Sequence, residues 1–452
     1  MHLKYDAIVI GSGQGGNPLA VKIADRGAKV ALIESGLFGG TCVNTGCTPT
    51  KTMVASAQVA YYARNAARWG VRTGEVSVDL PAILKRKNEV VERSRSGWPK
   101  KFANKVDVYH ERARFAGMRQ VQAGEHTLEG ERIFINTGAL ATIPPIEGLS
   151  GVPYLTNVTL LELQELPEHL LVLGGGYVAV EFGQMFRRFG SRVTIVQNGA
   201  RILPHEDEDV TTELQKCLEA EGIQFVLNGQ TSKVDAAGKQ IRLTVNGQEL
   251  SGSHLLVAVG RSPQSKDLDL EKTGVKVSEK GYIAVNERLE TSAPGIWAIG
   301  DVNGGPAFTH ISYNDYQIVY GNVYEGKNLS TRAREVPYGV FTDPTLGRVG
   351  ITEKEARAQG RPLKIGKVPM TWVARALERA ETSGFMKILV DATNDRILGA
   401  AILASEGAEL VQVLGALMLA DQPYTLLKGA VYIHPTLVEG FFALMDSVKP
   451  AN

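Results

Sequence analysis

Two segments of this 452-residue chain share one order of residue types, and this repeat constrains the fold more than any other feature. The first segment runs from Tyr5 to Glu34, and the second runs from His169 to Gln197. Each contains a short apolar run, a glycine-rich turn, a stretch with helical patterning and a second apolar run. This order is typical of a parallel strand–helix–strand unit. The sequence therefore predicts an α/β protein that contains two such units.

The first glycine-rich turn has the spacing of a dinucleotide-binding fingerprint. Gly11 permits the tight turn, Gly13 lets the backbone approach a pyrophosphate, and Gly16 allows close packing of helix on strand. Glu34 ends the second apolar run, where a carboxylate can accept hydrogen bonds from a ribose diol. The alternative is an ordinary βα turn with a solvated glutamate. The presence of strand, helix and acid in order favours a dinucleotide site.

The second turn carries Gly174 and Gly176, with Ala179 in place of the third glycine. Its following strand ends in the neutral Gln197, and Arg201 lies four residues further on. A neutral residue does not repel a 2′-phosphate as a carboxylate would, so the sequence favours NADPH over NADH. The alternative is that Arg201 is a solvated surface residue. Both turns together predict two Rossmann-like dinucleotide-binding domains.

Cys42 and Cys47 lie five positions apart, shortly after the first of these units. At a helix start they can close a small disulfide ring or face one partner as two thiols, and a helix N-terminus lowers the pKa of a thiol. A zinc site needs four ligands, and no other Cys or His lies between His2 and His110, so no metal site is predicted. Two small buried residues are the structural alternative.

His434 precedes Glu439 by five positions near the C-terminus. Such a pair can form a dyad in which the carboxylate orients the imidazole and raises its basicity. Taken alone, a structural histidine is the commoner explanation of this pattern.

The charge balance excludes several classes of protein. The chain has 49 Lys and Arg against 48 Asp and Glu, a net charge of +1, so no overall field attracts nucleic acid or an anionic membrane. No apolar run approaches the roughly 20 residues that span a bilayer, and the N-terminus lacks the features of a signal peptide. Three cysteines are typical of a reducing compartment, so we expect a cytoplasmic protein.

Together these residues resemble the pyridine nucleotide–disulfide oxidoreductases, flavoproteins such as glutathione reductase, dihydrolipoamide dehydrogenase and mercuric reductase. The resemblance covers essentially the whole chain. Besides the two glycine fingerprints it includes Gly-Gly-Thr-Cys-x4-Cys-x-Pro-Thr-Lys at 39–51, Ala-Val-Gly-Arg at 258–261, Ala-Ile-Gly-Asp at 298–301 and His-Pro-Thr-x-x-Glu at 434–439. It implies an enzyme that uses FAD and NAD(P)H.

The resemblance also implies how the chain is divided. Residues 1–148 form the first part of an FAD-binding domain with the redox cysteine pair, and 149–265 form an NAD(P)-binding domain. Residues 266–335 form the second part of the FAD-binding or central domain, and 336–452 form a C-terminal α+β dimerisation domain. Within the first part, residues 106–134 are expected to form antiparallel strands.

The same resemblance assigns roles to the cysteines and to the groups beside the flavin ring. Cys47 is the expected charge-transfer thiolate, and Cys42 is the expected interchange thiol that attacks the substrate. Lys51 and Glu181 form the expected ion pair near the position of hydride transfer, and Tyr177 covers the nicotinamide pocket.

Further cofactor contacts are implied for Thr41, Gly260 and Asp301, the last at the ribityl or phosphate part of FAD. His434 and Glu439 are the implied acid/base dyad, which completes the site of the other subunit of a homodimer. The His434–Pro435 peptide bond is expected to be cis, as in relatives.

The sequence thus predicts a reductase that passes electrons from NAD(P)H through FAD and the Cys42–Cys47 disulfide to a small disulfide or oxidised sulfur compound. The alternatives are reduction of a metal ion or inorganic oxidant of the mercuric, copper or hypothiocyanous-acid type at the same dithiol, a dihydrolipoamide dehydrogenase-like activity, and a non-enzymatic redox sensor. His434 stands where mercuric reductases have Tyr, and Gln197 where dihydrolipoamide dehydrogenases have an acid. The segments 308–315 and 348–353 are most similar to bacterial mercuric-reductase-like oxidant-response reductases.

Overall fold

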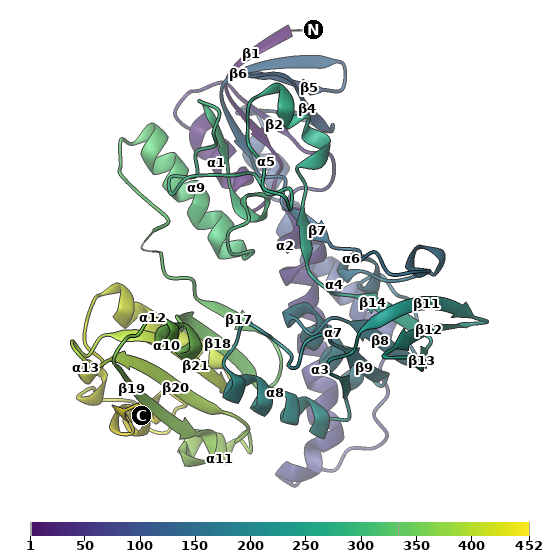
Figure 1. Ribbon diagram of the computed structural model, residues 1–452, viewed down its shortest axis with the longest axis vertical. Coiled ribbons are helices and arrows are strands. Elements are labelled where there is room, and N and C mark those ends of the chain that lie inside the picture. The colour runs from purple at the N-terminus through teal and green to yellow at the C-terminus, as the bar shows by residue number, and fades with distance from the viewer. Residues whose placement is uncertain (1, 333, 452) are drawn as a thin grey trace.

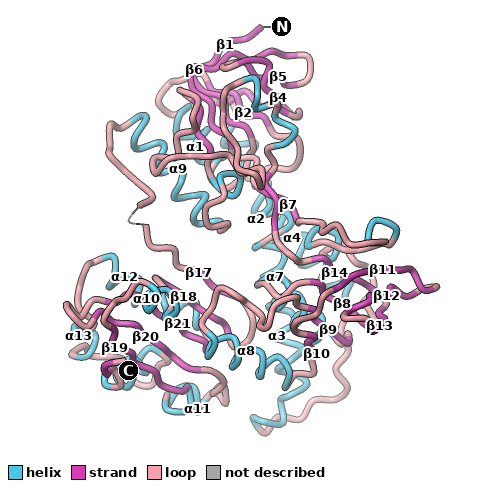
Figure 2. Tube along the Cα trace, viewed as in Figure 1, coloured by secondary structure: helices cyan, strands magenta, loops and turns pink. Residues whose placement is uncertain are grey.

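The computed structural model describes residues 2–332 and 334–451, which form three lobes, each built on its own sheet (Figure 1). The first lobe contains the N-terminus, the second contains the second glycine turn, and the third contains the C-terminus. Figure 2 shows helices on the sheets of all three lobes. The mixed α/β architecture predicted from the sequence is confirmed.

The first lobe is a layered α/β unit whose central strands are parallel. Its sheet runs in the order β3-β2-β1-β6-β5-β4, with β16 beside β6. The strands are β1 (His2–Ile10), β2 (Val30–Ile33), β3 (Val106–Tyr109), β4 (Ala113–Gly117), β5 (Gln120–Ala123), β6 (His126–Ile135) and β16 (Ile296–Ala298). Helices α1 (Gly16–Ala24), α5 (Trp98–Phe102) and α9 (Thr309–Tyr324) belong to the same lobe. The C-terminal half of β1 is buried without alternation, as in a parallel strand covered on both faces.

The expectation of antiparallel strands across residues 106–134 is only partly right. β4 and β5 pair antiparallel, as do β5 and β6. However, β3 pairs parallel with β2, and β6 pairs parallel with β1. Short apolar runs do not reveal the direction of their neighbours, which depends on where the chain crosses over.

The second lobe repeats the strand–helix–strand unit. Its parallel sheet runs in the order β10-β9-β8-β14, and a second, antiparallel sheet consists of β11, β12 and β13. The strands are β8 (His169–Leu173), β9 (Arg192–Val196), β10 (Gln224–Val226), β11 (Thr231–Ala237), β12 (Gln240–Val245), β13 (Gln248–Gly252) and β14 (His254–Val257). The helices are α6 (Asn157–Leu160), α7 (Tyr177–Phe189) and α8 (Glu208–Ala220). The paired strands β7 (Ala139–Ala141) and β15 (Arg261–Pro263) lie between the first two lobes.

The third lobe is an antiparallel sheet covered by helices, in the order β17-β18-β21-β20-β19-β22. The strands are β17 (Tyr338–Val340), β18 (Thr345–Gly350), β19 (Leu363–Pro369), β20 (Phe385–Asp391), β21 (Ile397–Ala404) and β22 (Lys449–Pro450). The helices are α10 (Glu353–Ala358), α11 (Ala374–Glu378), α12 (Gly407–Leu419), α13 (Thr425–Lys428) and α14 (Phe441–Asp446). No helix among residues 2–332 and 334–451 combines the length and the apolarity that a membrane crossing requires.

Helix α3 (Cys47–Asn65) connects the lobes. It follows α2 (Gly40–Thr45) in the first lobe, and it packs against α4 (Leu80–Arg95) and α7. Met53 and Ala57 of α3 share one core with Val180 of α7 and with Leu403 of the third lobe. The helix therefore begins beside α2 of the first lobe and packs further along on the second and third lobes. Its first residue, Cys47, is held where the lobes meet.

Candidate active site

A cavity of about 920 Å³ is lined by residues of all three lobes. Many of the residues predicted for the site line it. These are Gly11, Gly13, Glu34, Thr41, Cys42, Cys47, Lys51, Tyr177, Glu181 and Asp301. The cavity brings together residues from position 10 to position 412, and the predicted residues among them span positions 11 to 301.

The first glycine turn has no room for side chains. Gly11 has φ +99, and a Cβ there would lie 2.3 Å from the Asn136 carbonyl oxygen. A Cβ on Gly13 would lie 2.7 Å from Asn136 Oδ1, and one on Gly16 would lie 2.1 Å from the Gly11 oxygen. Gly16 does not line the cavity, and its N–H donates to Asn136 Oδ1 at 2.9 Å. Gly11 and Gly13 thus line the cavity, whereas Gly16 packs helix on strand.

Glu34 follows β2 and faces this turn. Its Oε2 accepts from the backbone N–H of Ser12 at 2.8 Å and from the Ser12 hydroxyl at 2.7 Å. Its Oε1 accepts from the backbone N–H of Gly36 at 2.7 Å. These bonds fix the carboxylate on the cavity wall, and Oε1, which accepts only one of them, keeps acceptor capacity for a ribose hydroxyl.

The cysteines lie on two consecutive helices. Cys42 is on α2 and is partly buried, and Cys47 is the first residue of α3 and is exposed. Both are free thiols. Gly46 separates the two helices, and a Cβ there would lie 2.8 Å from the Thr41 oxygen. The spacing in the sequence therefore corresponds to a sharp break between two helices.

The two thiols have opposite acidities. The hydrogen bond from Cys42 lowers the pKa of Cys47 to about 6, with further lowering by Thr309 and Lys51, against the effects of burial and Glu181. The pKa of Cys42 is raised because of its hydrogen bond to Cys47 and its burial. These shifts favour the negative charge on Cys47 and the proton on Cys42.

An ion pair between lobes borders the cysteines. Lys51, one helical turn after Cys47, lies 2.6 Å from Glu181 Oε2 of α7. The Glu181 side chain is 3% exposed, and its Oε1 accepts from the backbone N–H of Phe341 at 2.8 Å. The predicted pair is thus formed, and it also contacts the third lobe.

Aromatic rings form one side of the cavity. Tyr177, the first residue of α7, lies with its ring 6.3 Å from that of Phe308. Phe308 stacks on Tyr338 at 5.2 Å and on His310 at 5.4 Å. The Tyr338 hydroxyl donates to Glu206. Burial raises the pKa of Tyr177, so its hydroxyl stays protonated at neutral pH.

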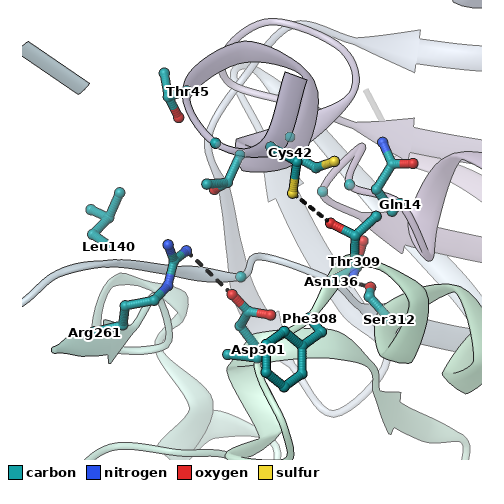
Figure 3. A pocket seen from close by; sticks show the side chains of 18 of the residues that line it. Gln14, Cys42, Thr45, Asn136, Leu140, Arg261, Asp301, Phe308, Thr309 and Ser312 are labelled. Carbon is teal, nitrogen blue, oxygen red and sulfur yellow. Dashed lines mark hydrogen bonds and ion pairs between the residues drawn. The ribbon is translucent and has the colours of Figure 1, made fainter. Parts of the chain in front are cut away.

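Asp301 lies in the first lobe, after β16. Its Oδ2 is 3.2 Å from Arg261 Nη2, as Figure 3 shows. Burial raises the pKa of Asp301, and the charge of Arg261 opposes that shift. Because Arg261 follows Gly260, this contact connects two of the motifs noted in the sequence.

The other residues predicted to bind the nucleotide do not line this cavity. They are Gly174 and Gly176 of the second glycine turn, Gln197, Arg201 and Gly260. Gly174 has φ +110, and a Cβ there would lie 2.4 Å from the Ala258 oxygen. Gln197 follows β9, and its Nε2 donates to the Arg201 carbonyl at 3.3 Å. Arg201 Nη1 pairs with Glu208 at 2.9 Å. Gln197 and Arg201 are therefore neighbours at the end of this sheet.

His434 and Glu439 form a pair on the third lobe. Nδ1 of His434 lies 3.0 Å from Glu439 Oε2, and the side chains are 75% and 15% exposed. Neither residue lines the cavity that contains the cysteines of the same chain. The His434–Pro435 peptide bond is cis, which confirms that expectation.

Sequence reasoning missed two side chains at the cavity. Asn136 is buried, and its Nδ2 donates to the Ile299 carbonyl at 2.8 Å while its Oδ1 accepts from Gly16. The Thr309 hydroxyl lies 3.2 Å from Cys47 Sγ. Thr309 is inside a segment whose similarity to relatives is visible, but the sequence does not indicate that it contacts a cysteine 262 positions away.

The residues present fit an FAD. The cavity volume, the turn with no room for a Cβ and the carboxylate fixed at the end of β2 are the features that a dinucleotide site requires. Glu34, Thr41, Lys51 and Asp301 are the side chains that would hold it.

Comparison with known families agrees with this geometry. The family model of pyridine nucleotide-disulphide oxidoreductases matches residues 5–315, and the model of their dimerisation domain matches residues 336–444. The chain therefore belongs to the pyridine nucleotide–disulphide oxidoreductase family. It is a flavoprotein enzyme with FAD and a pyridine nucleotide as cofactors, and it acts on sulfur groups.

Within this family the chain is similar to several named proteins. It is 38% identical to the probable pyridine nucleotide-disulfide oxidoreductase RclA of Escherichia coli, over 99% of this chain and 100% of RclA. It is 34% identical to a mercuric reductase of Bacillus cereus, over 90% of this chain and 66% of that protein. It is also 34% identical to a dihydrolipoyl dehydrogenase of Thermus scotoductus, over 98% and 97% of the two chains.

Solved structures give the same result. The structure of the HOCl-induced flavoprotein disulfide reductase RclA from E. coli matches with a TM-score of 0.91 and 37% identity, over 98% of this chain and 100% of that one. A Cu(II) complex of the same protein matches equally well. The family predicted from the sequence is confirmed.

The glycine turn can be tested directly. Because Gly11→Ala places a Cβ against Asn136 in a left-handed conformation, we expect strain of about 1–3 kcal/mol. That corresponds to a loss of FAD affinity of about 5- to 150-fold. The ratio of flavin to protein absorbance after purification and dialysis measures it. Gly74→Ala, where a Cβ meets open space, is the matched control. Equal flavin content in both variants would contradict the assignment.

Proposed function

We propose that the chain passes electrons from NADPH through FAD to the Cys42–Cys47 pair, and from there to a small disulfide or oxidised sulfur compound. The observation that carries the proposal is the asymmetric thiol pair on the wall of the cavity that also contains the first glycine turn. FAD, when bound, supplies the transfer of an electron pair from nicotinamide to sulfur.

The acidities of the two thiols divide their roles. The exposed Cys47 is a thiolate at neutral pH, so it can face the flavin as an electron donor. Cys42 is held as a thiol and needs a base before it attacks the substrate. In that attack the Cys42 sulfur bonds to one substrate sulfur, the substrate S–S bond breaks, and the leaving thiolate takes a proton. Cys47 then attacks Cys42, which re-forms the internal disulfide and releases the second thiol.

The base and acid in these steps are proposed to be His434, oriented by Glu439. The bond between Nδ1 and the Glu439 carboxylate leaves Nε2 available to exchange protons. Because this dyad does not line the cavity of its own chain, we propose that it completes the site of the second subunit in a homodimer. The match to a dimerisation domain supports this arrangement.

The roles of the cysteines predict distinct spectra. In anaerobic titration with NADPH, the wild type develops a long-wavelength charge-transfer band at two-electron reduction. Cys42→Ser keeps a thiolate at position 47 and retains a band but loses disulfide turnover, whereas Cys47→Ser loses both. Cys217→Ser, a partly buried cysteine away from the cavity wall, is the control and behaves as wild type. Full turnover in Cys42→Ser, or flavin bleaching without a band in the wild type, would refute the proposal.

The preference for NADPH rests on Gln197 and Arg201 at the end of β9. A carboxylate at position 197 would repel a 2′-phosphate by about 1–2 kcal/mol. We therefore expect Gln197→Glu to lower the ratio of kcat/KM for NADPH to that for NADH by about 5- to 30-fold. Steady-state kinetics with both nucleotides measure the ratio, and Gln240→Glu, at the exposed start of β12, is the control. An unchanged ratio would show that the enzyme does not distinguish NADPH from NADH at position 197.

A second candidate function is reduction of a metal ion or inorganic oxidant at the same dithiol. It is favoured by the similarity to RclA, which is described as HOCl-induced and has been solved as a Cu(II) complex. Among the described residues no group of three or more His, Cys, Asp and Glu side chains has the arrangement of a metal site. An ion would therefore meet the two thiols as a substrate.

His434 separates the two candidates. When a disulfide is reduced, one of its two sulfurs leaves as a thiolate that needs a proton. Reduction of Cu(II) or Hg(II) requires no such protonation. We expect His434→Gln to lower disulfide turnover by about 10²- to 10⁴-fold and to leave metal-ion turnover within a few-fold of wild type. His2→Gln, which alters another exposed His–Glu pair, is the matched control. Undiminished disulfide turnover in His434→Gln would exclude the dyad.

A further inference from the structure

Thr309 places a hydroxyl group beside the reactive sulfur. It is the first residue of α9, and its Oγ1 lies 3.2 Å from Sγ of Cys47. Both residues line the same cavity, although 262 positions separate them in the chain. This contact is not part of the reaction as proposed above.

The hydroxyl is not used to cap its own helix. Phe308 is the N-cap of α9, and no side chain caps that end of the helix. The Thr309 hydroxyl instead contacts Cys47, the first residue of α3. A threonine at a helix start commonly satisfies backbone N–H groups, so its use toward a sulfur on another helix needs a different explanation.

The position of α9 is set independently of Thr309. Asn136 donates to Ser312 of α9 at 3.3 Å and to the Ile299 carbonyl, and it accepts from Gly16. Asp315 of α9 accepts from the backbone N–H of Gly300 at 2.8 Å. These bonds hold the start of α9 against the glycine turn, so the hydroxyl is presented to Cys47 by a fixed scaffold.

The charges around Cys47 come from several elements. Cys47 is at the N-terminus of α3 and faces that of α9, and both ends carry partial positive charge. Lys51 of α3 adds a full positive charge, while Glu181 and Tyr177 of α7 and Cys42 of α2 face the same space. The thiolate therefore depends on several groups, of which Thr309 is a neutral one that can donate to it directly. Thr309 also lowers the pKa of Cys42, but there the raising effects of the hydrogen bond to Cys47 and of burial are larger.

We propose that the Thr309 hydroxyl is the hydrogen-bond donor that keeps the negative charge of the reduced pair on Cys47. When a hydride equivalent reduces the Cys42–Cys47 disulfide, its electron pair breaks the S–S bond and its proton goes to Cys42. Cys47 then remains a thiolate, and Thr309 donates its O–H to that sulfur without losing the proton. This inference rests on the proposed function and adds a positioning residue to it.

The direction of the pKa change at Cys47 depends on whether Thr309 donates to the thiolate or to the protonated thiol. A hydrogen bond to the thiolate favours the charged form, so its removal raises the pKa of Cys47. When one hydrogen bond to a charged group is lost, we expect the midpoint of the Cys47 titration to rise by about one pH unit. The thiolate is present above its pKa and is lost as the pH falls through it. The variant therefore loses thiolate at a higher pH than the wild type does.

The test compares Thr309→Val, which keeps the shape and removes the hydroxyl, with Thr309→Ser, which keeps the hydroxyl. The reduced holoenzyme is alkylated with iodoacetamide across pH 4.5–9, and peptide mass spectrometry follows Cys47 separately from Cys42. We expect the wild-type midpoint near 6, as the lowered pKa implies. We expect the alkylation midpoint of Cys47 to be about one pH unit higher in Thr309→Val and close to the wild-type value in Thr309→Ser. Thr45→Val, on the wall of the same cavity, is the matched control.

The charge-transfer band provides a second readout, because its intensity follows the Cys47 thiolate over the same pH range. Equal midpoints for Thr309→Val and wild type would overturn the inference. Equal upward shifts in Thr309→Val and Thr309→Ser would also overturn it, since they would indicate a packing effect. Failure of the proposed function is distinguishable, because a wild-type enzyme without any charge-transfer band would show that Cys47 does not face the flavin.

Discussion

The buried carboxylate of Glu181 connects all three lobes, and the geometry of the site depends on it. One oxygen pairs with Lys51 of α3, and the other accepts from the backbone N–H of Phe341 in the third lobe. Glu181 itself belongs to α7 of the second lobe. Glu181 is buried while Lys51 is 32% exposed, and leaving a buried polar group without its hydrogen-bond partners costs about 1–3 kcal/mol. Any motion that separates the lobes here would meet that cost, so the start of α3 is held in one place.

The contact between the two cysteines explains why they differ in acidity. Cys47 is the first residue of the long helix α3, whereas Cys42 is on the short α2 before the break at Gly46. The hydrogen bond between the two sulfurs lowers the pKa of Cys47 and raises that of Cys42, while Lys51 and Thr309 lower both. The asymmetry therefore arises mainly from how the two helices place one sulfur against the other, and it exists before any substrate binds. A disulfide reductase needs such an asymmetry, because one sulfur must hold the electron pair while the other attacks.

The sequence predicted those features that depend on short spacings. The two glycine turns, the cysteine pair and the His434–Glu439 pair each lie within a few residues, and the chain alone shows them. Lys51 and Glu181 were paired by resemblance to a family. Asn136 and Thr309 were not found, because each contacts its partner across more than a hundred positions and neither residue type indicates that contact. The parallel pairing of β3 with β2 and of β6 with β1 was missed for the same reason, since pairing depends on crossovers.

The chain segment around His434 carries exposed apolar side chains, which bears on the proposal that His434 acts in a homodimer. Val431 is 98% exposed and Ile433 is 78% exposed, and Leu419 and Leu426 of the same lobe are also exposed. Apolar side chains gathered on a surface in this way mark an interface between proteins. Val431 and Ile433 lie just before His434 in the chain. In the homodimer proposed above, a second copy of the chain would bury these side chains and bring its own cavity to the dyad. Under that proposal, oligomerisation and catalysis depend on the same few residues of the third lobe.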